Sequence, residues 1–82
     1  MAKSELIALC KNFKPGDKAN FQKIISAFIT MDKNNEMELT REFEVAISTV
    51  RRWITGIATP HPLVQNKIVR EIILIAKRGE NG

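Results

Sequence analysis

The chain has 82 residues, of which 44% are hydrophobic and 27% charged, a composition that suits one small globular domain spanning 1–82 and excludes a chain that is disordered as a whole. No apolar run approaches the ~20 residues that a transmembrane helix needs, and the N-terminal segment lacks a signal-peptide cleavage pattern, so we expect a cytoplasmic protein without a membrane partner. The 13 Lys and Arg residues outnumber the 9 Asp and Glu residues, and the formal net charge of +4 suits a polyanionic partner.

The N-terminal segment, residues 1–16, predicts an extra helix followed by a turn. Apolar residues recur at helical spacing as far as Phe13, Ser4 is the predicted N-cap, and Pro15 with Gly16 breaks the helix. Because one face of this helix is apolar, we expect it to pack against the rest of the chain.

The next segment, from about Asp17 or Asn20 to Met31, has the most regular helical periodicity in the sequence. Its apolar positions are Phe21, Ile24, Ile25, Phe28 and Ile29. The run of polar residues at 32–35 is expected to be a loop.

Residues 36–56 predict two short helices joined by a tight turn. Apolar residues repeat at spacings of three and four in each helix, which places them on one helical face. These residues are Leu39, Phe43, Val50, Trp53 and Ile54. Gly56 is expected to close the second helix, because glycine adopts positive φ at little cost. Pro60 prevents continuation, and Pro62 fits the first turn of another helix.

The turn between the two helices is predicted at Glu44 to Ala46, with Val45 as a buried plug. The order of residues in this segment resembles the helix-turn-helix of phage repressor and Cro-like proteins. It runs from Leu39-Thr40 through Phe43-Glu44-Val45 and Ser48 to Trp53, and ends with Gly56 and Pro60. The resemblance implies an all-α, lambda repressor-like bundle of about five helices that binds double-stranded DNA at specific sequences and regulates transcription.

Three residues depart from the pattern of that family. Thr40 replaces a small apolar residue, Glu44 replaces the turn glycine, and Ala46 replaces the Ser or Thr that caps the recognition helix. The change at Glu44 has the largest consequence, because a residue other than glycine rarely adopts positive φ. Either Glu44 is strained, or the turn has another geometry.

The resemblance also implies which side chains touch DNA. In this family the recognition helix lies in the major groove, and its N-terminal side chains contact base edges. Carried over position by position, Ile47, Ser48 and Arg52 would face the bases, and Thr49 and Arg51 would face the phosphates.

After Pro62, residues 63–78 predict one long helix whose last turn is basic, and Gly79 is expected to stop it. Residues 79–82 are expected to be a disordered tail. The helix has too many apolar residues for one narrow stripe. It is therefore either packed on two sides within the monomer, with the N-terminal helix as the second cover, or it meets another copy in a homodimer.

No pattern in the sequence predicts catalysis or a bound cofactor. Trp53 is expected in the core rather than as a stacking platform for single strands, and Cys10 is expected to be a buried packing thiol. His61 has no Cys, Asp or Glu neighbours at ligand spacing, and the loop at 14–18 has one glycine instead of a phosphate-binding series. We therefore expect no enzymatic activity, metal, cofactor or small-molecule substrate.

The charge distribution supports an alternative function. Residues 36–62 contain three Arg and four Glu, whereas the segments on either side are net basic. Carboxylates near the first helix of the pair repel a phosphate backbone, and they are Glu36, Glu38, Glu42 and Glu44. Together with the altered turn and the very apolar last helix, they favour a protein-interaction module on the same fold, antitoxin-like or a regulatory adaptor, that does not bind DNA.

Overall fold

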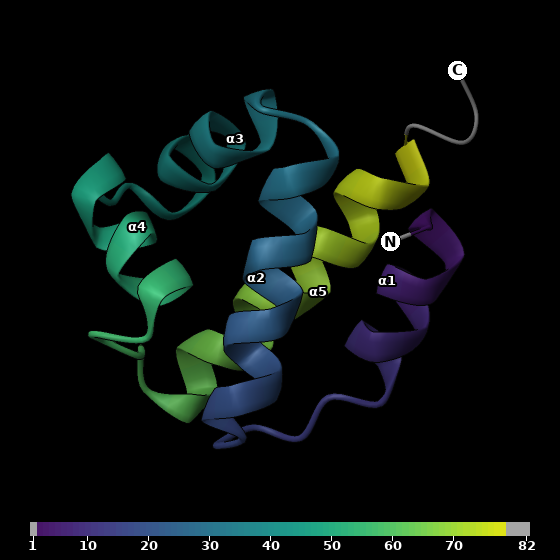
Figure 1. Ribbon diagram of the computed structural model, residues 1–82, viewed down its shortest axis with the longest axis horizontal. Coiled ribbons are helices and arrows are strands. Elements are labelled where there is room, and N and C mark those ends of the chain that lie inside the picture. Colours follow the sequence, from purple (N-terminus) through teal and green to yellow (C-terminus); the bar gives the residue numbers. More distant parts are fainter. Residues whose placement is uncertain (1, 79–82) are drawn as a thin grey trace.

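The structure is a computed structural model that describes residues 2–78, and within this range it contains five α-helices and no strand (Figure 1). The helices are α1 (Lys3–Lys11), α2 (Lys18–Met31), α3 (Asn34–Phe43), α4 (Ile47–Thr55) and α5 (Pro62–Arg78). The expected all-α bundle of about five helices is thus confirmed. The predicted stop at Gly79 and the predicted disorder of residues 79–82 lie outside the described residues.

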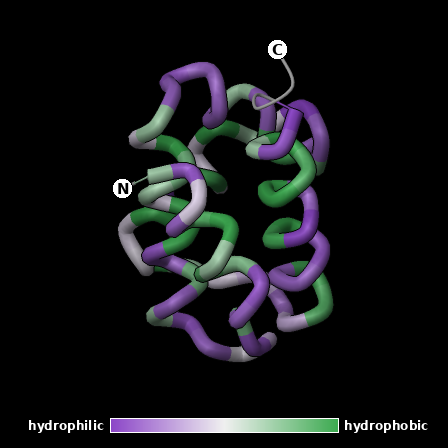
Figure 2. Tube along the Cα trace, turned by 90° about the vertical axis from the view of Figure 1, so that its right-hand side faces the viewer, coloured by the Kyte–Doolittle hydropathy of each residue, from purple (hydrophilic) through white to green (hydrophobic). Residues whose placement is uncertain are grey.

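Helix α2 lies at the centre of the bundle, and each of the other four helices packs against it (Figure 1). Its apolar residues recur three and four positions apart, so they share one face, as the sequence predicts. They are at most 1% exposed and are Phe21, Ile24, Ile25 and Phe28. Figure 2 shows the same pattern in the whole chain, with hydrophobic stretches toward the interior and hydrophilic stretches outside.

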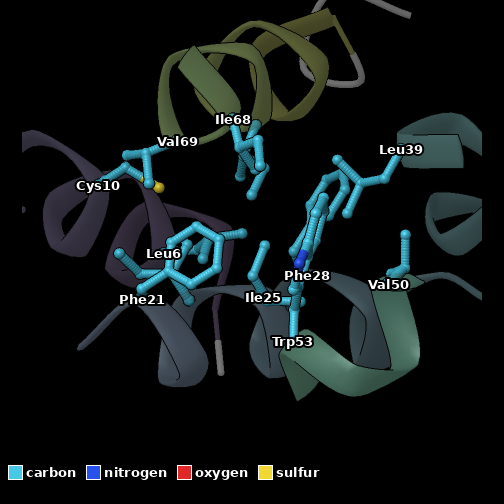
Figure 3. Packing of buried hydrophobic residues seen from close by; sticks show 12 residues of the cluster. Leu6, Cys10, Phe21, Ile25, Phe28, Leu39, Val50, Trp53, Ile68 and Val69 are labelled. Carbon is cyan, nitrogen blue, oxygen red and sulfur yellow. The ribbon is translucent and has the colours of Figure 1, made fainter. Parts of the chain in front are cut away.

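The core contains residues from all five helices, and Trp53 is the residue of α4 that packs beside Phe21 of α2 in this core (Figure 3). The indole is only 5% exposed, and its ring lies 6.2 Å from that of Phe21 in an edge-to-face arrangement. Trp53 is therefore a core residue, as expected, and is not available to stack on a nucleic-acid base. Cys10 is also buried, and burial raises the pKa of its thiol to about 11.

Helix α5 is covered on two sides within the monomer, by α2 and by α1. The N-terminal helix thus supplies the second cover that the sequence left open as one of two alternatives. The side chains of α5 that face these helices are Gln65, Ile68, Val69, Ile72 and Ala76. Leu63 and Leu74 remain 71% and 57% exposed. None of the described helices is long and apolar enough to cross a bilayer.

Two helix starts differ from the sequence expectation. The N-cap of α1 is Ala2 instead of Ser4, because the carbonyl of Ala2 already accepts a hydrogen bond from the Leu6 N–H at 3.1 Å. Ser4 therefore lies in the first turn, and the predicted N-cap is wrong.

The polar loop expected at residues 32–35 is also wrong, because α3 begins at Asn34. The Asp32 carboxylate accepts a hydrogen bond from the Asn34 N–H at 2.9 Å. The Asn35 side-chain amide donates to the Phe28 carbonyl at 2.7 Å, near the end of α2. The Asp32 carboxylate thus satisfies a backbone N–H at the start of α3, and the Asn35 amide satisfies a carbonyl near the end of α2. These bonds offset the poor intrinsic preference of asparagine for helix.

Pro62 is the first residue of α5, as predicted, and its neighbours define the helix start. The His61 imidazole Nδ1 accepts a hydrogen bond from the Leu63 N–H at 3.1 Å, and the His61 carbonyl accepts one from the Val64 N–H at 2.8 Å. The single histidine thus accepts hydrogen bonds from backbone N–H groups in the first turn of α5.

Gln65 connects two loops to α5 through its side chain. It is 1% exposed and is the one buried polar residue among the described residues. Its Oε1 accepts a hydrogen bond from the Gly16 N–H at 2.7 Å, and its Nε2 donates to the Pro60 carbonyl at 3.0 Å. One side chain therefore holds both the α1–α2 turn and the α4–α5 loop.

We predict that Gln65→Leu lowers the free energy of unfolding by about 2 kcal/mol, because the side chain keeps its approximate volume but leaves the Gly16 N–H and Pro60 carbonyl without partners. For a domain of this size the midpoint of thermal unfolding falls by roughly 10 °C. Asn66→Leu, at the next position, is the control and shifts the midpoint little. Equal melting of the Gln65 variant and the unchanged protein contradicts this role.

Candidate nucleic-acid interface

Helices α3 and α4 are joined by the three residues Glu44 to Ala46. On the inner side of this pair, Leu39 and Val50 are fully buried, and Val45 is partly buried against the core. Val45 thus packs against the core, but it is less buried than the predicted plug between the two helices. In Figure 1, α4 lies at the edge of the molecule, where its inner side contacts α2 and α3.

Glu44 adopts the left-handed conformation, with φ 51° and ψ 46°, and is the one residue other than glycine with positive φ among those described. Its N–H donates to the Thr40 carbonyl, and the Val45 N–H donates to the same oxygen at 3.2 Å. These bonds close the last turn of α3 only if the chain reverses at Glu44. Of the two alternatives that the sequence leaves open, the structure has the strained one.

The other departures from the family pattern are satisfied locally. Ala46 is the N-cap of α4 and provides no side-chain hydrogen bond, so only its carbonyl serves the helix, accepting the Thr49 N–H at 3.0 Å. The Thr40 hydroxyl donates to the Met37 carbonyl of its own helix at 2.7 Å. Neither substitution prevents the two helices from packing.

The end of α4 is fixed to α2 at Gly56, the predicted C-cap, which has φ 82°. The Gln22 side-chain amide of α2 donates to the Ile54 carbonyl at 2.8 Å. A Cβ atom at Gly56 would lie 3.0 Å from Oε1 of Gln22, closer than normal contact. Both the backbone conformation and the approach of Gln22 therefore favour glycine.

The outer face of α4 carries the residues that the sequence assigned to DNA. The expected base-contacting residues Ile47, Ser48 and Arg52 are exposed, Ile47 at 36%. Of the two expected phosphate-contacting residues, Arg51 is exposed and Thr49 is partly buried. All five thus lie on one short helix whose opposite side is anchored by Val50 and Trp53, and four of them are open to solvent.

Arg51 forms an ion pair with Glu36 that sequence reasoning missed. Arg51 Nε lies 3.3 Å from Glu36 Oε2, and Nη2 lies 3.5 Å from Oε1. It is the one ion pair found between residues 2 and 78. The two residues are on different helices, so no spacing within either helix predicts the contact. Arg52, the next residue, has no hydrogen-bond or ion-pair partner for its guanidinium in the described part of the chain.

The remaining carboxylates of α3 and of the turn after it differ in exposure. Glu42 and Glu44 are exposed, and Glu38 is partly buried. Charges within about one Debye length, ~8 Å at physiological salt, act on a phosphate at the surface of α4. The face thus combines cationic groups on α4 with anionic groups on α3.

The described residues contain no group of three or more His, Cys, Asp or Glu side chains that can hold a metal ion. No family model, no curated protein and no solved structure matches this chain. The arrangement of α3, the turn and α4 therefore has to be interpreted from its own residues.

We predict that Glu44→Gly raises the free energy of unfolding by about 0.5–1 kcal/mol. Relief of the left-handed strain exceeds the entropy that glycine adds to the unfolded chain. The midpoint of thermal unfolding is expected to rise by roughly 4 °C. Glu44→Ala, which removes the same carboxylate but keeps a Cβ atom, is the control and gives no such rise. If both variants melt alike, the effect comes from charge and not from φ.

Proposed function

We propose that this protein binds double-stranded DNA at specific sequences through α4 and acts as a small transcriptional regulator. One observation carries the proposal: a short helix is anchored on its inner side by Val50 and Trp53 and presents Ser48, Arg51 and Arg52 to solvent on the other. An α-helix fits the major groove of B-DNA, where each base pair presents its own pattern of donors and acceptors.

The residues at the start and middle of α4 offer distinct contacts to base edges. Arg52 has an unpartnered guanidinium that can bond guanine O6 and N7 together, at about 1–3 kcal/mol of discrimination against another base. Ser48 donates or accepts a hydrogen bond, and Ile47 offers an apolar contact to a thymine methyl. In this proposal these three side chains read the sequence.

Phosphate contacts are assigned to Arg51 and Thr49. The Arg51 side chain is 64% exposed, so a phosphate oxygen can approach its guanidinium from solvent, in competition with Glu36. Thr49 is partly buried and contributes through its hydroxyl, because its N–H already donates to the Ala46 carbonyl. Such contacts fix the orientation of the protein on the duplex without reading sequence.

A homodimer through α5 belongs to the same proposal, since Leu63 and Leu74 remain exposed on that helix. These residues are eleven positions apart, which places them on one side of an α-helix. A two-fold dimer would match a palindromic operator with half-sites about 34–36 Å apart. The exposed Lys67 and Arg70 lie between the two leucines and would oppose close approach of two copies.

The second candidate function is a protein-interaction module, and the Arg51–Glu36 pair is the observation that favours it. The pair neutralises one of the two cations on α4, and α3 carries two further carboxylates, Glu38 and Glu42. A basic or mixed-charge protein surface would meet less repulsion here than a phosphate backbone would.

The test is binding of fluorescent random-sequence duplex DNA over a salt series, with the Arg51→Ala/Arg52→Ala double variant alongside. We expect the affinity of the unchanged protein to fall steeply as salt rises, because bound phosphates release counterions. The double variant is expected to bind at least about tenfold more weakly, as the loss of one or two guanidinium contacts implies.

The matched control is the Lys11→Ala/Lys14→Ala double variant, which removes the same charge from the exposed end of α1 and the turn after it, outside α4 and α5. It is expected to bind DNA within about twofold of the unchanged protein, since only long-range attraction is lost. Equal losses in both double variants indicate net charge instead of α4. If no variant and no unchanged protein binds DNA at low salt, the regulator proposal fails, and the protein-interaction module becomes the leading function.

A further inference from the structure

The two adjacent arginines of α4 differ in their surroundings. Arg51 is paired with Glu36 of α3, whereas the guanidinium of Arg52 has no partner between residues 2 and 78. The sequence gives them the same charge and adjacent positions, so only the fold separates them. In the free protein, one arginine is neutralised and the other is available.

The carboxylate of this pair is less exposed than the guanidinium. Glu36 lies in the first turn of α3, and its side chain is 19% exposed, against 64% for Arg51. The negative end of the pair is therefore fixed beside the fold, and the positive end reaches toward solvent. A phosphate that approaches Arg51 has to compete with a carboxylate that is already in place.

We propose that Glu36 lowers the sequence-independent affinity of the DNA-binding surface for DNA by acting through Arg51. This inference rests on the proposed function. By pairing with Arg51, Glu36 removes one cation from sequence-independent attraction to the phosphate backbone. The contacts of Ile47, Ser48 and Arg52 with bases are unaffected, so a duplex without the matching sequence is bound more weakly while a specific site still offers its base contacts.

Glu36 is a positioning residue in this proposal, because it touches Arg51 and not DNA. The exchange of Glu36 for a phosphate breaks the interaction of the guanidinium with the carboxylate and forms one with a phosphate oxygen. Binding that uses Arg51 therefore leaves a carboxylate without its partner close to DNA. Only a site on which α4 makes its full set of base contacts offsets that cost.

The test is a double-mutant cycle of Glu36→Gln and Arg51→Gln, measured on labelled random-sequence duplex DNA over a salt series. Glu36→Gln is expected to bind more tightly than the unchanged protein, with a logarithmic salt slope steeper by about 0.9 for the one phosphate gained. Its advantage therefore shrinks about 3.5-fold between about 50 and about 200 mM salt.

The Arg51 variants separate pairing from simple repulsion. In the Arg51→Gln background, Glu36→Gln is expected to give no gain in affinity and no change in slope. Glu42→Gln removes an exposed carboxylate of α3 that pairs with no arginine and is expected to leave the slope unchanged. Thermal melts of all variants confirm that each one is folded at the temperature of the binding assay.

The outcomes distinguish this inference from the proposed function. If Glu36→Gln gains nothing, gains as much in the Arg51→Gln background, or gains no more than Glu42→Gln, the inference is overturned while DNA binding by α4 stands. If no protein in the set binds DNA at low salt, the proposed function fails and the role of Glu36 fails with it.

Discussion

The apolar face of α2 is the surface on which the other four helices assemble. Phe21, Ile24, Ile25 and Phe28 lie along it, and each full burial of such a side chain contributes about 1.5–3 kcal/mol. A chain of this size buries only ~60–65% of the surface that its unfolded form exposes, so little of this contribution can be lost. Helix α4 depends on it directly, because Trp53 packs on Phe21 and fixes which residues of α4 face outward.

Much of this arrangement is encoded locally and can therefore be predicted from sequence. The periodicity of α2, the closing glycine at Gly56 and the proline that opens α5 are properties of neighbouring residues. The positive φ of Glu44 can be predicted only in part from sequence. The sequence shows an unusual residue at the turn, but it does not show which backbone conformation that residue adopts.

The features that sequence reasoning missed depend on residues from separate elements. Asn35 belongs to α3, where its side-chain amide donates to the carbonyl of Phe28 on α2. Helix propensity takes no account of such a contact between two helices. The pairing of Glu36 with Arg51 also depends on residues from two helices. From the sequence, the four glutamates predict only repulsion of a phosphate backbone, because the fold is needed to place one of them beside a particular arginine. The sequence therefore predicts which residues of α4 are candidates for contact with DNA, but it does not predict which of their charges are paired.

The hydrogen bonds of Gln65 have a consequence for cooperativity. Gly16 and Pro60 are far apart in the chain, yet both backbone groups depend on the same side chain. Opening either loop leaves part of that amide unsatisfied and weakens the hold on the other loop. Opening of the α1–α2 turn is therefore coupled to opening of the α4–α5 loop that follows the candidate surface.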